Sequence, residues 1–111
     1  MDFAKFSRIN KERAMIWHKG DIGNWSMGDW ALAVAGEVGE ICNIIKKYNR
    51  FRDGLPSNNP KGFSFDDLAD EIADTVIYCD LLATRCGFDL EQIIIHKFNK
   101  ISDREGLPQR L

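Results

Sequence analysis

The sequence predicts an all-α fold, an antiparallel bundle of about four helices. Apolar residues recur at three- and four-residue spacing along most of the 111-residue chain, which is the period of an α-helix facing a core. No segment alternates apolar and polar residues over more than a few positions, as a strand would. The length suits a single domain covering residues 1–111, whose modest core a partner subunit would help to complete.

The first predicted helix covers residues 3–19, and the glycine-containing stretch 20–24 ends it. Its apolar residues in rough helical spacing are Phe3, Phe6, Ile9, Ala14 and Trp17. Ser26 or Asp29 can cap the second helix, which runs to about Tyr48. Basic residues follow at its C-terminal end, where positive charge favours the helix dipole.

A long loop at residues 51–64 separates the second and third helices. It contains two prolines, two glycines and two asparagines, and it is long enough to let the chain reverse direction. Ser64 or Asp66 can cap the third helix, which continues to about Arg85 and ends at Gly87. We therefore expect the second and third helices to pack side by side and antiparallel.

The fourth predicted helix covers residues 90–101, with Asp89 as its cap, and the tail 102–111 is predicted to be irregular. Its apolar residues are too numerous for one small core to cover: Ile93, Ile94, Ile95, Phe98 and Ile101. Since adjacent helical residues face different directions, we expect an obligate oligomer.

Two pairs of acidic residues lie inside apolar helical segments. Glu37 and Glu40 belong to GEVGE, and Glu71 and Asp74 belong to DEIAD. Residues three apart share one face of a helix, and here that face also carries the apolar residues. In an antiparallel helix pair, the four carboxylates can therefore converge on one interior point.

These acids predict a site for a hard divalent cation. Ionised carboxylates are costly to bury unless a cation, a basic partner or a raised pKa compensates. Solvated helix acids usually have a basic residue four positions on, whereas Ile41 follows Glu37 and Thr75 follows Glu71 at that spacing. All-oxygen ligation suits Mg²⁺, with Mn²⁺ as a substitute, while Zn²⁺ would call for His or Cys.

Composition excludes several other classes. The net charge of -2 provides no basic field for polymeric nucleic acid. No stretch approaches the ~18 apolar residues of a membrane span, and the N-terminal residues lack a signal-peptide core, so we expect a cytoplasmic protein with no membrane partner. The three cysteines form no CxxC pair, and we expect Cys42 and Cys79 to be small buried thiols.

The acidic pairs and their surroundings resemble a known family. GEVGE at residues 36–40, the loop, and DEIADTVIY at residues 70–78 are similar to the ExxE…ExxD signature of MazG-like, all-α nucleoside triphosphate pyrophosphohydrolases. The resemblance covers about residues 25–104, including GFDL at residues 87–90 and HKFNKISDR at residues 96–104.

This resemblance implies a homodimer or homotetramer that binds Mg²⁺ and cleaves a nucleoside triphosphate to the monophosphate and pyrophosphate, as nucleotide-pool house-cleaning. Glu37, Glu40, Glu71 and Asp74 match the metal-binding acids of the family. Hydrolysis of a triphosphate suits such acids, because the cations that they hold neutralise the phosphate charge and activate the attacking water. We expect Glu40 to take the proton of that water as the catalytic base.

The substrate-binding candidates are Lys97, Asn99, Trp25 and Trp30. Related enzymes carry a phosphate-contacting lysine where this chain has Lys97. Relatives specialised for cytosine nucleotides place an asparagine four residues after that lysine, whereas this chain has Ile101 there and Asn99 two residues earlier, which weakens any transfer of base specificity. Trp25 and Trp30 flank the start of the second helix, where they can stack on a base or anchor packing.

Two alternatives stay open. A phosphoribosyl-ATP or dUTP-specific pyrophosphohydrolase uses similar acids, and a non-catalytic helical interaction module would place them at an interface. A carboxylate-bridged di-iron bundle is excluded, because it needs Glu-x-x-His on two helices and neither His18 nor His96 stands three residues after a glutamate.

Overall fold

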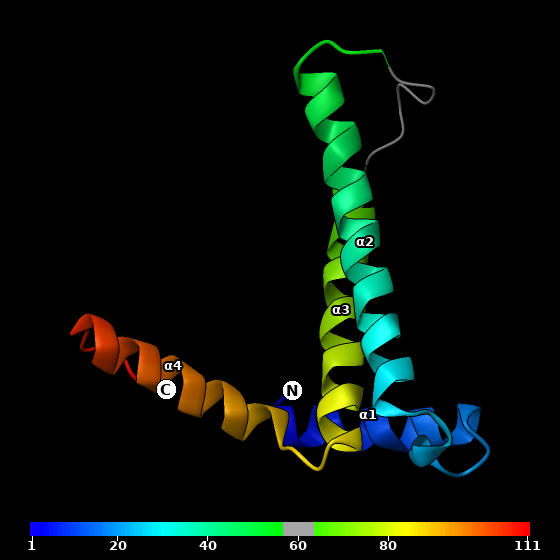
Figure 1. Cartoon of the computed structure of the whole chain (residues 1–111), viewed down its shortest axis with the longest axis vertical. Helices are drawn as coiled ribbons and strands as arrows, with labels where there is room; N and C mark the ends of the chain where they lie inside the picture. The colour runs from blue at the N-terminus through cyan, green and yellow to red at the C-terminus, as the bar shows by residue number, and fades with distance from the viewer. Residues whose placement is uncertain (57–63) are drawn as a thin grey trace. The chain divides into compact units, whose positions relative to one another are not determined.

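The computed structural model describes residues 1–56 and 64–111, most of which fold into α-helices (Figure 1). The elements are α1 (Phe3–Trp17), the 3₁₀ turn η1 (Ile22–Asn24), α2 (Met27–Arg52), α3 (Phe65–Arg85) and α4 (Leu90–Glu105). These residues contain no strand, so the all-α prediction is confirmed. Within the same ranges, no helix combines the length and the apolar character that crossing a bilayer requires.

The helices belong to two compact units. One unit comprises Met1–Met27 with Asp80–Leu111, and the other comprises Gly28–Cys79. The second unit therefore holds nearly all of α2 and most of α3, while the first holds α1, η1, the end of α3 and α4. The organisation as one domain stays a prediction.

Three helices begin at side-chain caps. Asp2, Ser64 and Asp89 each accept a hydrogen bond from the backbone N–H three residues on, at 2.7, 3.3 and 3.1 Å. Such bonds satisfy donors that have no partner inside the helix. The predicted caps Ser64 and Asp89 are thus confirmed. α1 ends at Trp17, two residues short of its predicted end, and the chain turns through Gly20 with φ of 88°.

Two helices run about one turn further than predicted, α2 to Arg52 and α4 to Glu105. Each is followed by a glycine in the left-handed region, Gly54 with φ of 66° and Gly106 with φ of 67°. The N–H after each glycine donates to the carbonyl five residues earlier, at 2.8 Å, which is the Schellman form of helix closure. The prediction that residues 102–105 are irregular is therefore wrong.

In the second unit, α2 and α3 lie side by side and antiparallel (Figure 1). Trp30 near the start of α2 contacts Tyr78 late in α3, with ring centroids 6.3 Å apart. Tyr48 late in α2 contacts Phe65 at the start of α3, with centroids 5.7 Å apart. The predicted reversal of the chain is confirmed, and half of the predicted loop, residues 57–63, lies outside the described residues.

The first unit has a small core in which an acid is buried. Its buried residues are Asn10, Ala14, Asp80, Leu81, Ala83 and Ser102. Asp80 is 1% exposed, and its carboxylate accepts hydrogen bonds from the Ser7 hydroxyl and from Asn10 Nδ2, the latter at 2.9 Å. Neutral donors thus hold a buried carboxylate and join α1 to α3. We did not predict this contact, although an acid beside Leu81 in an apolar run was its signal.

The cysteines depart from the prediction in one case. Cys42 is exposed on α2, so it is not a core residue of this chain. Cys79 on α3 is partly buried, and burial raises the pKa of its thiol.

Candidate metal centre

Three carboxylates meet between α2 and α3. Glu37, Glu71 and Asp74 each offer one oxygen, and these oxygens all lie within 4.8 Å of one another. Glu37 and Glu71 are half-buried and Asp74 is exposed. Three of the four predicted acids therefore converge, and we call them the acidic cluster.

Packing on both sides of the acidic cluster sets the spacing of the two helices. Trp30 stands seven residues before Glu37, about 10 Å along the helix, and contacts Tyr78 on α3. The contact of Tyr48 with Phe65 lies on the other side of the cluster. Because aromatic contacts join the helices both before and after the acids, the carboxylates on opposing helices stay within reach of one another.

Electrostatics in the acidic cluster favours a cation. The hydrogen bond that the protonated Glu71 carboxyl donates to Glu37 raises the pKa of Glu71, and desolvation by burial and the nearby negative charges raise it further. The charges are those of Glu37, Asp74 and Asp70. Among the described residues, no lysine or arginine forms an ion pair with a cluster carboxylate. A proton or a metal ion is thus what relieves the repulsion.

The donor set fits a hard divalent cation. Carboxylate oxygens are the ligands that Mg²⁺ and Mn²⁺ prefer, and opposite oxygens around Mg²⁺ lie about 4.2 Å apart. The cluster oxygens all lie within 4.8 Å of one another, which is close to that span, so the three side chains are near enough to be ligands of one ion. Three carboxylates also leave coordination positions for water and phosphate.

Glu40 is not part of the acidic cluster. It lies one turn after Glu37 on α2 and is exposed. Because α2 and α3 are antiparallel and Glu37 lies near Glu71, three residues on along α2 correspond to three residues back along α3, where the residue is the apolar Leu68. The structure therefore separates Glu40 from the three acids that converge, and its carboxylate faces solvent.

The two candidate tryptophans are both engaged in packing. Trp30 is 1% exposed and lies against Tyr78, so its ring has no free face for a base in this structure. Trp25 is half-buried, with its ring edge-on to His18 at a centroid distance of 4.7 Å. Its carbonyl accepts a hydrogen bond from Arg85 Nε at 2.8 Å, a contact that we did not predict.

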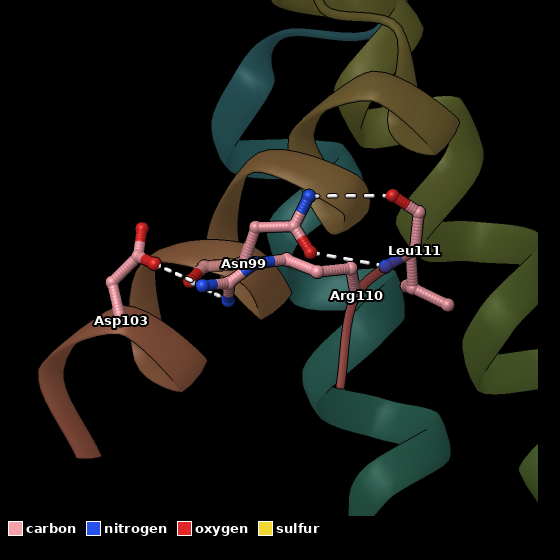
Figure 2. Close-up of polar contacts among 4 residues, drawn as sticks. All are labelled: Asn99, Asp103, Arg110 and Leu111. Atoms are coloured by element: carbon pink, nitrogen blue, oxygen red, sulfur yellow. Dashed lines mark hydrogen bonds and ion pairs between the residues drawn. The ribbon is translucent and has the colours of Figure 1, made fainter. Parts of the chain in front are cut away.

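Lys97 and Asn99 occupy different sides of α4. Two residues apart in a helix point roughly 200° from each other around the axis. Lys97 is exposed and lines an apolar groove of about 520 Å³. The residues that line this groove are Leu90, Ile93, Ile94, Lys97, Phe98 and Ile101. The side-chain amide of Asn99 instead binds the backbone of Leu111 (Figure 2).

The described residues thus define an all-α chain with a carboxylate cluster suited to a divalent cation. The sequence is similar to curated proteins named dCTP pyrophosphatase 1: it is 34% identical to the Mus musculus protein and 32% identical to the Rattus norvegicus protein, over 80 residues each. Each match covers 72% of this chain and 45% of the relative.

A third relative comes from a bacteriophage. The Gene 37 protein of Mycobacterium phage L5 is 31% identical over 74 residues, which cover 67% of this chain and 61% of the phage protein. The chain thus spans about half the length of the curated relatives it matches. No protein-family model matches the sequence, and no solved structure matches it.

Proposed function

We propose that this chain is a nucleoside triphosphate pyrophosphohydrolase of the MazG-like, all-α kind. The acidic cluster carries the proposal, because its three carboxylates form no ion pair with a basic residue in the described part of the chain and are suited to a cation, and a triphosphate substrate binds through cations. The similarity to proteins named dCTP pyrophosphatase 1 supports the same reaction class. The reaction converts a nucleoside triphosphate and water to the monophosphate and pyrophosphate, as cytoplasmic house-cleaning.

In this proposal Glu37, Glu71 and Asp74 hold Mg²⁺, which neutralises phosphate charge and makes water a better nucleophile. Glu40 accepts the proton of the attacking water. Its exposed carboxylate, one turn from Glu37 and outside the acidic cluster, suits a base better than a ligand. Lys97 contacts phosphate, as the family resemblance implies, and Trp25, an aromatic residue just before α2, stacks on the base.

We do not extend a cytosine preference to this chain. Ile101, which replaces the asparagine of the cytosine-specific relatives, lines the same groove as Lys97 and has no hydrogen-bonding group in its side chain. Sites that read a base by hydrogen bonds reject analogues strongly, whereas apolar sites discriminate weakly. We therefore propose a broad specificity for the base.

We further propose that the chain works as a homo-oligomer. Large apolar side chains are exposed on all four α-helices, among them Ile9 and Ile16 on α1, Leu32, Val38 and Ile45 on α2, Ile72 and Val76 on α3, and Ile93, Ile94, Phe98 and Ile101 on α4. Exposed apolar faces of this extent mark association surfaces. Copies of the same chain are the partners that a closed symmetric assembly provides.

The test is pyrophosphate release from a panel of canonical and modified nucleoside triphosphates, including dCTP and dUTP, with Mg²⁺, with Mn²⁺ and with a chelator. We expect metal-dependent pyrophosphate release from several members of the panel. Glu71→Gln should abolish it, and Glu91→Gln, which removes an acid outside the acidic cluster, should not. Release of orthophosphate, or no turnover with either metal, would contradict the proposal.

A further inference from the structure

The last residues of the chain fold back onto α4. Asn99 Nδ2 donates to the Leu111 carbonyl at 3.3 Å, and Asn99 Oδ1 accepts from the Leu111 N–H at 3.0 Å (Figure 2). One side-chain amide thus pairs with both backbone groups of one residue, as a neighbouring strand would in a sheet. The side chain of Asn99 thus binds the backbone of Leu111 at this point.

Arg110 adds two contacts beside this pair. Its Nη1 donates to the backbone carbonyl of Asn99 at 3.2 Å, and its Nη2 forms an ion pair with Asp103 (Figure 2). Asn99 and Asp103 are four residues apart and therefore lie on one face of α4. Asn99 therefore binds the backbone of Leu111, and Asp103 binds the side chain of the adjacent Arg110.

These contacts are distinct from those that end the helix. α4 closes through Gly106 and the bond from Leu107 N–H to the Ser102 carbonyl at 2.8 Å, neither of which involves Asn99. The contacts of residues 110 and 111 are largely exposed, with side chains of Arg110 and Asp103 46% and 68% accessible. Exposed hydrogen bonds and ion pairs are individually weak. The tail can therefore detach while α4 stays folded.

We propose that residues 108–111 form a strap that opens and closes on α4 as a unit, hinged after Leu107, whose N–H stays bonded to the Ser102 carbonyl. Asn99 recognises the backbone of Leu111, and Asp103 recognises the Arg110 side chain. In the closed state both hydrogen-bonding groups of the Asn99 side-chain amide are occupied by the strap. The strap lies on the side of α4 opposite to Lys97 and leaves the groove beside Lys97 uncovered.

Backbone amide exchange with water, measured by NMR on the full chain, tests this proposal. Asn99→Ala should speed exchange of the Leu111 amide about tenfold, because its acceptor is lost and the strap opens more often. The Leu107 amide, whose acceptor is the Ser102 carbonyl, should keep its exchange rate. Gln92→Ala, an exposed change on the same side of α4, should leave both amides unchanged.

Arg110→Ala provides a second test that leaves the helix sequence intact. It should also speed exchange at Leu111, and in the unmodified chain added salt should do the same, because the ion pair with Asp103 is exposed to screening. If Leu111 exchange is unchanged in both variants, the strap does not exist in solution. If Leu107 and Leu111 accelerate together, the tail opens only when α4 frays, and the proposal is wrong.

Discussion

Removing one acid from the cluster should affect metal binding and stability in opposite senses. Glu71→Gln deletes a cluster carboxylate whose pKa is raised by the hydrogen bond to Glu37, by burial and by neighbouring charges. The metal-free protein should be at least as stable as wild type, since a repulsive charge has gone. Metal binding should weaken, because one of three ligands has lost its charge.

The size of the effect follows from linkage between binding and folding. At a Mg²⁺ concentration of about 100 times the dissociation constant, binding to the folded state adds about 2.7 kcal/mol to the free energy of unfolding. For a chain of 111 residues, about 1 kcal/mol corresponds to roughly 4 °C in Tm, so Mg²⁺ should raise Tm by roughly 11 °C. A hundredfold weaker site would show a rise of only about 2 °C at the same concentration.

Thermal melts without and with Mg²⁺ measure, for each variant, the stability of the metal-free protein and the rise in Tm that the metal causes. Glu91→Gln is the matched control, because it replaces a glutamate on α4 that lies outside the acidic cluster. It should show the full metal-induced rise. Equal metal-induced rises in Glu71→Gln and Glu91→Gln would refute the metal site and identify the acids as ordinary solvated helix residues.

Other perturbations test separate parts of the account. Glu40→Gln should lower turnover by about 10²–10⁴-fold while keeping the Mg²⁺-induced rise in Tm, and loss of both would make Glu40 a ligand. Because the folded state raises the pKa of Glu71 above its ordinary 4.5, the native protein binds more protons, so metal-free stability should fall as pH rises through the folded pKa. In Glu71→Gln, the free energy of unfolding measured by chemical denaturation should not show this fall as pH rises. Asp80→Ala should lower the free energy of unfolding by about 2 kcal/mol, against at most about 0.5 kcal/mol for the exposed Glu12→Ala. Ile94→Glu should reduce the molar mass in light scattering, and a wild type that is already monomeric at micromolar concentration would refute the oligomer.

Local chemistry made the helices predictable. Ser64 and Asp89 are capping residues placed directly before apolar helical patterns, and both cap helices in the structure. The ends were harder to predict because a helix stops where its last carbonyls find partners, and periodicity does not show that point. The closures after Gly54 and Gly106 carry two helices about one turn beyond their predicted ends.

The sequence was enough to predict that acids make up the candidate site, but not which acids on α2 lie opposite which acids on α3. The three-residue spacing places both acids of each pair on one face, but it does not fix how far α3 slides along α2. That register is set by contacts such as Trp30 with Tyr78, and it brings Glu37 to Glu71 while Glu40, one turn further along α2, is exposed. Sequence also cannot tell whether a tryptophan at a helix start faces solvent, and Trp30 is buried.

The most direct test of the central claim is ³¹P NMR of a triphosphate such as dCTP incubated with the chain and Mg²⁺. We expect the triphosphate signals to give way to equal amounts of monophosphate and pyrophosphate, a chelator to stop the reaction, and Glu71→Gln to leave the substrate intact. Appearance of diphosphate and orthophosphate, or conversion by Glu71→Gln at the wild-type rate, would contradict that claim.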